Sequence, residues 1–261
     1  EKGDRVAAWL PNIAEGIIGM LATASIGAIW SSCSPDFGPA GVLDRFGQIA
    51  PKVFLAVDGY LYGGKRFSNA AKIAEVMAGF ERRPRLVIVP FIGDAAALAI
   101  PGAVSLGQFI APHARAALSF TRVPFDHPLY ILFSSGTTGK PKCIVHGHGG
   151  ILLKHAAEHY FHTDLKPADR LFYFTTLGWM MWNWLASGLM TGATLILFDG
   201  NPFHPGPHAL FDIAEQEGMT VFGTSAKYID GLAKAGARPR DTHDLSKLKA
   251  MTSTGSPLAP E

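Results

Sequence analysis

The segment between Leu129 and His146 concentrates residue types that bind anions. Between two apolar stretches lie four hydroxyl residues, two glycines and two lysines, namely Ser134, Ser135, Gly136, Thr137, Thr138, Gly139, Lys140 and Lys142. Glycine lets backbone N–H groups approach a ligand closely, hydroxyls donate hydrogen bonds without adding charge, and lysines supply positive charge. The combination predicts a loop that cradles a polyphosphate.

This loop differs from the common phosphate loop in which a lysine and a hydroxyl residue open a helix. Pro141 follows Lys140 and biases it away from helical backbone angles. We therefore expect a strand, a loop and a second strand over residues 129–146. An ordinary surface hairpin is the alternative for a Gly/Ser/Thr/Lys loop considered only by its composition.

The order of residues in this run resembles the Thr/Ser-rich phosphate loop of the adenylate-forming enzymes, which include acyl-CoA synthetases, peptide-synthetase adenylation domains and luciferases. The resemblance implies that residues 134–142 bind the phosphates of ATP. It gives Thr138 and Lys142 the catalytic roles and Thr137 a further phosphate contact. Gly136 and Gly139 would permit close approach of the backbone.

A second cluster, Gly178 to Trp184, holds three tryptophans and two methionines within seven residues. Aromatic and methionine side chains at this density more often pack a core than line a ligand site. The cluster follows an expected strand, however, and open α/β sheets bind ligands beyond the carboxyl ends of their strands. Both interpretations stay open from the residues alone.

The resemblance extends over essentially the whole chain and is strongest to the acetoacetate-activating branch of the acyl-CoA synthetases. It rests on the strings from Ala28 to Gly38, Leu43 to Phe46, Gly178 to Gly192 and Thr252 to Leu258. It implies an acyl pocket and an adenine-binding turn. The acyl pocket would consist of Trp179, Met180, Met181 and Thr254, and the adenine turn of Gly255, Ser256 and Pro257.

Two further features have competing interpretations. Lys65 and Arg66 follow two glycines; they are either a solvated turn or, by resemblance to short-chain acyl-CoA synthetases, a contact for the 3′-phosphate of CoA. Ser256 stands where many relatives carry an acid, which fits the acetoacetate branch.

Three histidines, His155, His159 and His162, have the spacing of one helix face. The intervening residues supply no general base of the His-Glu-x-x-His kind. We interpret these histidines as lying on a solvent-exposed helix face rather than forming a metal site.

The reaction that the resemblance implies has two steps. A carboxylate attacks the α-phosphate of ATP to give acyl-AMP and pyrophosphate, and CoA then displaces AMP. ATP, Mg²⁺ and CoA would be required, with acetoacetate as the acid, and this segment would contribute no metal ligand. The alternatives are a ligase for another short carboxylate, such as acetate or propionate, and an ATP-binding module without catalysis.

Composition excludes several other classes of function. The net charge is +2 over 261 residues, so no strong field favours nucleic acid or a membrane surface. The apolar run from Ile13 to Trp30 is interrupted by Glu15 and small residues, and we interpret it as a buried helix and strand. Cys33 and Cys143 lack metal-ligand spacing and are expected to be buried free thiols in the cytoplasm. The oligomeric state is not predicted.

Apolar strands alternate with amphipathic helices along the chain, which predicts an α/β fold of two mostly parallel sheets flanked by helices. Expected strands include residues 85–89 and 194–198, and expected helices include 106–110 and 225–234. We expect one subdomain over 1–126 and a second, carrying the phosphate loop, over 127–261. The absence of an initial Met suggests a piece of a longer protein, here an N-terminal-domain fragment without its C-terminal domain.

Overall fold

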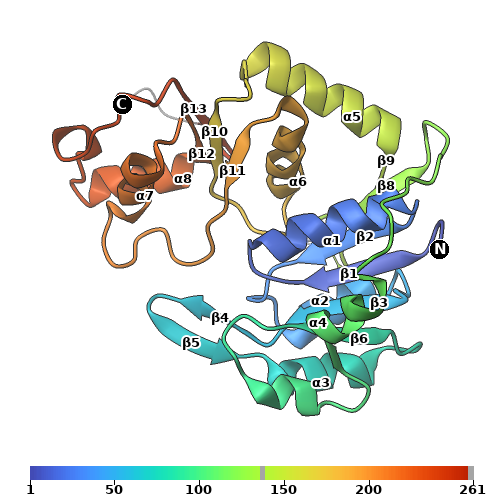
Figure 1. Cartoon of the computed structure of the whole chain (residues 1–261). Helices are drawn as coiled ribbons and strands as arrows, with labels where there is room; N and C mark the ends of the chain where they lie inside the picture. Colours follow the sequence, from blue (N-terminus) through green and yellow to red (C-terminus); the bar gives the residue numbers. More distant parts are fainter. Residues whose placement is uncertain (136–138, 258–261) are drawn as a thin grey trace. The chain divides into compact units, whose positions relative to one another are not determined.

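The structure is a computed structural model that describes residues 1–135 and 139–257 (Figure 1). The chain groups into two compact units, each described here by itself. The first comprises Glu1–Leu61, Lys65–Ile151 and Thr176–Met180; the second comprises Tyr62–Gly64, Leu152–Thr175 and residues from Met181 onward. The expected division into domains at residues 126 and 127 stays a prediction.

A seven-stranded sheet forms the centre of the first unit, in the order β7-β6-β3-β1-β2-β8-β9. All neighbouring pairs are parallel except β8 and β9, which are antiparallel. The strands are β1 (Arg5–Trp9), β2 (Ile29–Cys33), β3 (Val53–Val57), β6 (Arg85–Val89), β7 (Val104–Ser105), β8 (Pro128–Phe133) and β9 (Cys143–Gly147).

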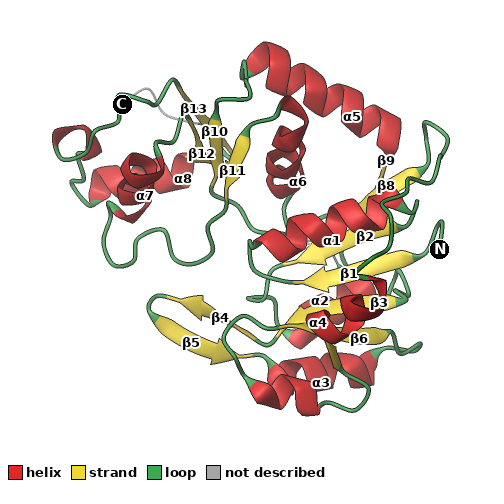
Figure 2. Cartoon of the chain, viewed as in Figure 1, coloured by secondary structure: helices red, strands yellow, loops and turns green. Residues whose placement is uncertain are grey.

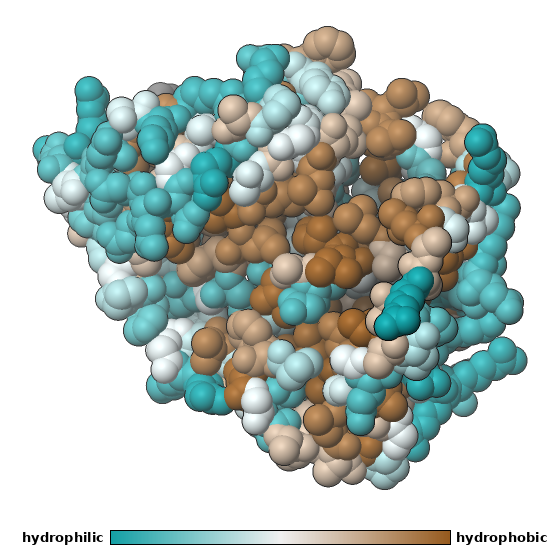
Figure 3. Space-filling view, viewed as in Figure 1, coloured by the Kyte–Doolittle hydropathy of each residue, from teal (hydrophilic) through white to brown (hydrophobic). Residues whose placement is uncertain are grey.

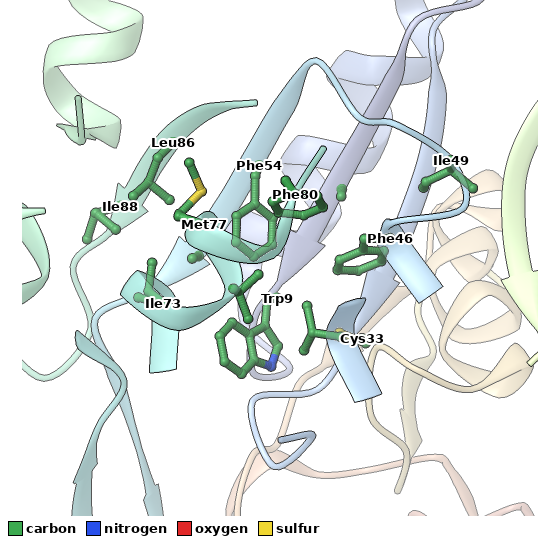
Figure 4. Close-up of a cluster of buried hydrophobic side chains, with 14 of the residues drawn as sticks. Trp9, Cys33, Phe46, Ile49, Phe54, Ile73, Met77, Phe80, Leu86 and Ile88 are labelled. Carbon is green, nitrogen blue, oxygen red and sulfur yellow. The ribbon is translucent and has the colours of Figure 1, made fainter. Parts of the chain in front are cut away.

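Alternating side chains of these strands pack on opposite faces of the sheet. Trp9 and Phe54 belong to a cluster with α2 and α3 residues (Figure 4), while Trp30 and Leu55 face Gly19 of α1. Both faces are therefore covered by helices, as a parallel sheet requires. The helices of this unit are α1 (Ala14–Ser25), α2 (Pro39–Phe46), α3 (Ala70–Gly79) and α4 (Leu106–Ile110), with 3₁₀ turns η1 (Ala95–Ala99) and η2 (Ala111–His113).

The second unit contains a four-stranded parallel sheet in the order β11-β10-β12-β13. Phe172 and Phe222 pack against α7 and α8 on one face, and Leu171 and Tyr173 pack against α6 on the other. The strands are β10 (Arg170–Tyr173), β11 (Thr194–Ile196), β12 (Val221–Ser225) and β13 (Ala250–Thr254). The helices are α6 (Met180–Ser187), α7 (Ala209–Glu217) and α8 (Ala226–Lys234), with short turns η4 (Gly188–Thr191) and η5 (Pro239–Asp241).

Helix α5 (His148–Ala157) runs from the first unit into the second and continues as a π-helical turn, η3 (Glu158–His162). A separate two-stranded hairpin, β4 (Gly59–Tyr62) and β5 (Lys65–Ser68), was not expected from the sequence. The fold class is confirmed: both larger sheets are parallel or mostly parallel and carry helices on their faces (Figure 2).

Candidate active site

The expected strand, loop and strand around residues 129–146 is confirmed by β8 and β9. Phe133 pairs with Cys143 at the open end of this antiparallel pair. The Ser134 N–H donates to the Lys142 carbonyl oxygen at 3.0 Å, and the Lys142 N–H donates to the Ser134 hydroxyl at 2.9 Å. These two hydrogen bonds close the base of the loop.

Gln48, just beyond α2, also holds this base. Its side-chain amide donates to the Pro141 carbonyl oxygen at 2.8 Å, and the same amide nitrogen donates to the Asp44 carbonyl oxygen at 2.6 Å. The Cys143 thiol lies 3.8 Å from the Gln48 amide oxygen. No sequence pattern around Gln48 indicates this contact, and it was not predicted.

The described loop residues present polar groups to solvent. Ser135, Lys140 and Lys142 are exposed, Pro141 is buried, and Gly139 has a φ of +144° that favours glycine. The remaining predicted phosphate ligands, Gly136, Thr137 and Thr138, lie outside the described residues.

The predicted acyl-pocket residues Trp179 and Met180 belong to a segment that packs at the carboxyl end of β2. The Ser32 hydroxyl donates to the Leu177 carbonyl oxygen at 2.9 Å. A side chain at Gly178 would come within 3.3 Å of the Phe37 ring and 3.7 Å of the Cys33 backbone. Trp179 and Met180 follow with largely exposed side chains.

Strands β2 and β8 are parallel neighbours, and the Ser31 hydroxyl donates to the Ile131 carbonyl oxygen between them at 2.8 Å. β8 ends at Phe133 and β2 ends at Cys33, so the carboxyl ends of both strands lie at the same edge of the sheet. Leu177 and Gly178 pack at that edge, where open α/β sheets bind ligands.

The other predicted ligand-binding residues have these positions. Met181, in the first turn of α6, is partly buried against the hydrophobic cluster between α6 and the second sheet. Thr254 is the last residue of β13. Gly255 follows with a φ of +95°, and Ser256 and Pro257 are exposed beyond it. Lys65 and Arg66 are exposed on β5, where the Arg66 guanidinium donates to the Ile92 carbonyl oxygen. Their ligand roles stay predictions.

Two expectations from the sequence were wrong. His155 and His159 are buried, and only His162 lies on an exposed face, because the π-helical turn and packing against α6 were not visible in the spacing. Cys33 is buried as expected, but Cys143 is exposed because β9 is an edge strand.

Across residues 1–135 and 139–257, no three His, Cys, Asp or Glu side chains gather where they could hold a metal ion. In the same described part of the chain, no helix is both long and apolar enough to span a membrane.

The model of the family described as AMP-binding enzyme matches residues 1–261. The chain belongs to this family. It is 62% identical over 261 residues to an acetoacetyl-coenzyme A synthetase of Rhizobium meliloti, and 47% identical over 264 residues to an acetoacetyl-CoA synthetase of Mus musculus. Each comparison covers 99% of this chain, but the chain spans only about 40% of the length of these relatives.

A solved structure of an acetoacetyl-CoA synthetase from Streptomyces lividans matches with a TM-score of 0.94 at 46% identity. The match covers 100% of this chain and 40% of that chain. The mixed α/β fold described above, with parallel sheets flanked by helices, is therefore similar to the fold of that synthetase.

Proposed function

We propose that the full-length protein is an ATP-dependent acetoacetate–CoA ligase. Its family and the names of its relatives support this proposal. The observation that supports it best is that β8, which leads into the predicted phosphate loop, and β2, on which residue Leu177 packs, are parallel neighbours in the first sheet. With the roles that the resemblance implies, phosphate-binding and acid-binding residues would lie at the same edge of that sheet.

In the proposed reaction, an oxygen of the acid attacks the α-phosphorus of ATP and pyrophosphate leaves. The thiol sulfur of CoA then attacks the acyl carbon, its proton is lost, and AMP leaves with the oxygen that came from the acid. The protein contributes mainly alignment of the reactants and neutralisation of charge. Mg²⁺ would accompany the phosphates and offset their charge, with ligands outside the described residues of this chain.

The loop residues would act on the phosphates. Lys142 and Lys140 supply positive charge, and Ser135 with Gly139 supplies hydroxyl and backbone donors. Thr137 and Thr138 would add hydroxyl donors on the basis of the motif. Gln48 and Ser134 would support these residues by holding Pro141 and Lys142 at the base of the loop.

The acid would lie against Trp179, Met180 and Met181, with Thr254 nearby on the basis of the family resemblance. A tryptophan that closes the pocket suits a short keto acid. The adenine would lie against Gly255, Ser256 and Pro257, and the CoA 3′-phosphate near Lys65 and Arg66. We further propose a cytoplasmic, reducing location, because Cys33 and Cys143 are free thiols.

The test is acid-dependent pyrophosphate release by the full-length protein with ATP, Mg²⁺ and a panel of acids. The panel contains acetoacetate, acetate, propionate, butyrate and hexanoate. The proposal predicts the highest kcat/KM with acetoacetate. Higher kcat/KM with an unsubstituted acid would reassign the substrate, and no release with any acid would refute the ligase activity.

A further inference from the structure

Helix α5 ends in a π-helical turn that directs one histidine into the second unit. The Thr163 N–H donates to the Glu158 carbonyl oxygen at 2.9 Å, which is the i to i+5 bond of a π-helix. His159 within this turn is fully buried, whereas His162 at its end is exposed. Single π turns within helices frequently occur at functional sites.

His159 contacts the last turn of α6. Its Nε2 lies 2.8 Å from the Ser187 hydroxyl and 3.1 Å from the Trp184 carbonyl oxygen, and its ring lies 4.4 Å from the Trp184 ring between centroids. The Ser187 hydroxyl itself donates to the Trp184 carbonyl oxygen at 2.7 Å. Because that hydroxyl proton is already used, Nε2 must carry the hydrogen that links His159 to α6.

The surroundings of the other ring nitrogen of His159, Nδ1, also favour the tautomer with its hydrogen on Nε2. Nδ1 of His159 is buried and has no hydrogen-bond partner among the described residues. Burial lowers the pKa of His159, although the bond to the Trp184 carbonyl and the charge of Glu158 oppose that shift. His159 is therefore a neutral imidazole with a single donor, and that donor is directed at the end of α6.

The carboxyl end of α6 has carbonyl groups that need hydrogen-bond donors. The last carbonyl groups of a helix lack backbone N–H partners within the helix. The Trp184 carbonyl oxygen is one of them, and it accepts from the Ser187 hydroxyl and from His159. Beyond it, a side chain at Gly188 would come within 2.6 Å of Leu171 on β10, so the helix end already packs closely on the sheet. Met180 and Met181 lie in the first turn of the same helix, about 10 Å from Ser187 along the helix axis.

We infer that His159 is a positioning residue for the acid site. Its Nε2–H fixes the carboxyl end of α6, and the rigid helix transmits that position to Met180 and Met181. This inference rests on the proposed function, in which the first turn of α6 borders the acid. His159 itself touches no reactant; it sets the width of the acid pocket.

The test compares His159→Leu and His159→Gln in the full-length protein. Leucine removes the donor, whereas glutamine restores an N–H near the position of Nε2 and does not titrate. Tyr160→Phe is the matched control, because it removes a hydrogen bond of 3.1 Å from the same turn to the Met190 carbonyl oxygen, beyond α6. For each variant, KM for acetoacetate, KM for ATP, kcat and the melting temperature are measured.

We expect His159→Leu to raise KM for acetoacetate about 10-fold while KM for ATP stays within about 2-fold, because only one wall of the site moves. His159→Gln should recover most of the loss, and Tyr160→Phe should resemble the wild type. If His159→Leu does not fold, Ser187→Ala removes the nearer of the two α6 acceptors of Nε2 and should produce a smaller rise that is again selective for acetoacetate.

Equal changes in both KM values, or a wild-type KM for acetoacetate in the folded Leu and Ala variants, would overturn the inference while the ligase activity of the wild type stands. A failure of His159→Gln to recover the loss would also overturn it. A wild-type protein that releases no pyrophosphate with any acid would overturn the proposed function and this inference together.

Discussion

Gln48 is the residue that links the proposed phosphate loop to the body of the first unit. Gln48→Leu should raise KM for ATP about 2- to 10-fold, since a single hydrogen bond contributes about 0.5–1.5 kcal/mol net. The melting temperature should change little. Initial rates at varied ATP concentration measure the effect.

Gln108→Leu is the matched control for Gln48→Leu, because Gln108 hydrogen-bonds to Ser105 at the start of α4, away from the loop. An unchanged KM for ATP in the Gln48 variant, or an equal rise in the Gln108 variant, would show that the loop base does not depend on this contact.

Trp179 tests the proposed acid wall. Its side chain is 61% exposed, and it follows Leu177 and Gly178, which pack at the end of β2. Trp179→Gly should open the pocket and shift preference toward longer acids, because each methylene in an apolar pocket is worth about 1–3 kcal/mol. The ratio of kcat/KM for hexanoate and acetoacetate measures the shift. A ratio equal to that of the wild type would make Trp179 a packing residue only.

At the residue scale, the sequence predicted what local composition determines. Pro141 and the apolar stretches on either side of the loop predicted a strand, a loop and a strand, which β8 and β9 confirm, while phosphate binding by residues 134–142 stays a prediction. Gln48 and His159 act through partners far along the chain, at Pro141 and at Ser187. A helical wheel cannot identify such partners, which is why His155 and His159 were wrongly expected to face solvent.

Among the elements, three parallel strands of the second sheet are tied together at their starts. Asp169, Thr220 and Lys249 each precede one strand, β10, β12 and β13. The Asp169 carboxylate accepts from the Thr220 hydroxyl at 2.9 Å and from the Lys249 ammonium at 2.6 Å. It also accepts from the Lys166 N–H at 2.7 Å. One buried carboxylate therefore bridges all three strands.

The pKa of Asp169 gives this bridge a defined pH dependence. Burial raises the pKa, but the Lys249 ammonium and the N–H and O–H donors outweigh burial and lower it below the ordinary value of 3.8. The charged form thus stabilises the folded state above the unfolded pKa. That stabilisation is lost as pH falls through the lower folded pKa.

Asp169→Asn should therefore lower the free energy of unfolding by about 1–3 kcal/mol at neutral pH. The difference from the wild type should shrink below pH about 4, where the wild-type stabilisation is lost. Denaturant unfolding from pH 7 to pH 3 provides the measurement. Asp164→Asn is the control, since that exposed carboxylate pairs with Lys166 at the surface and should matter little. A difference for Asp169→Asn that is independent of pH would contradict the electrostatic account.

Element prediction succeeded where a local signal was strong, namely an apolar run in β6 and a capping box at the start of α4. The buried strand β6 and the capped helix α4 match the expected 85–89 and 106–110. The hairpin of β4 and β5 was missed because β5 is wholly exposed and lacks an apolar alternation. Its Gly63-Gly64 turn, with both φ values positive, was the available signal.

Over the whole molecule, apolar surface remains exposed on the first unit. Ile18 and Leu21 of α1 line a groove with Leu118 and Phe120, and all four side chains are about half to three-quarters exposed. Hydrophobic atoms gather over α1 in Figure 3. Residues 1–261 produced alone should therefore self-associate.

Leu118→Ser with Phe120→Ser should reduce this association, measured by light scattering against concentration. Leu153→Ser on α5 is the control, because it removes an exposed leucine that does not line the groove. Equal scattering from the double variant and the unaltered segment would refute the role of the groove.

The central claim is that the full-length protein joins acetoacetate to AMP before it transfers the acyl group to CoA. The most direct measurement uses acetoacetate labelled with ¹⁸O in its carboxylate, together with ATP, Mg²⁺ and CoA, and mass analysis of the products. Attack of the carboxylate on the α-phosphorus leaves one acid-derived oxygen on the nucleotide when CoA displaces it. The account predicts AMP carrying one ¹⁸O, in amounts equal to the acetoacetyl-CoA formed. Acetoacetyl-CoA formed with unlabelled AMP, or with the label in inorganic phosphate, would contradict it.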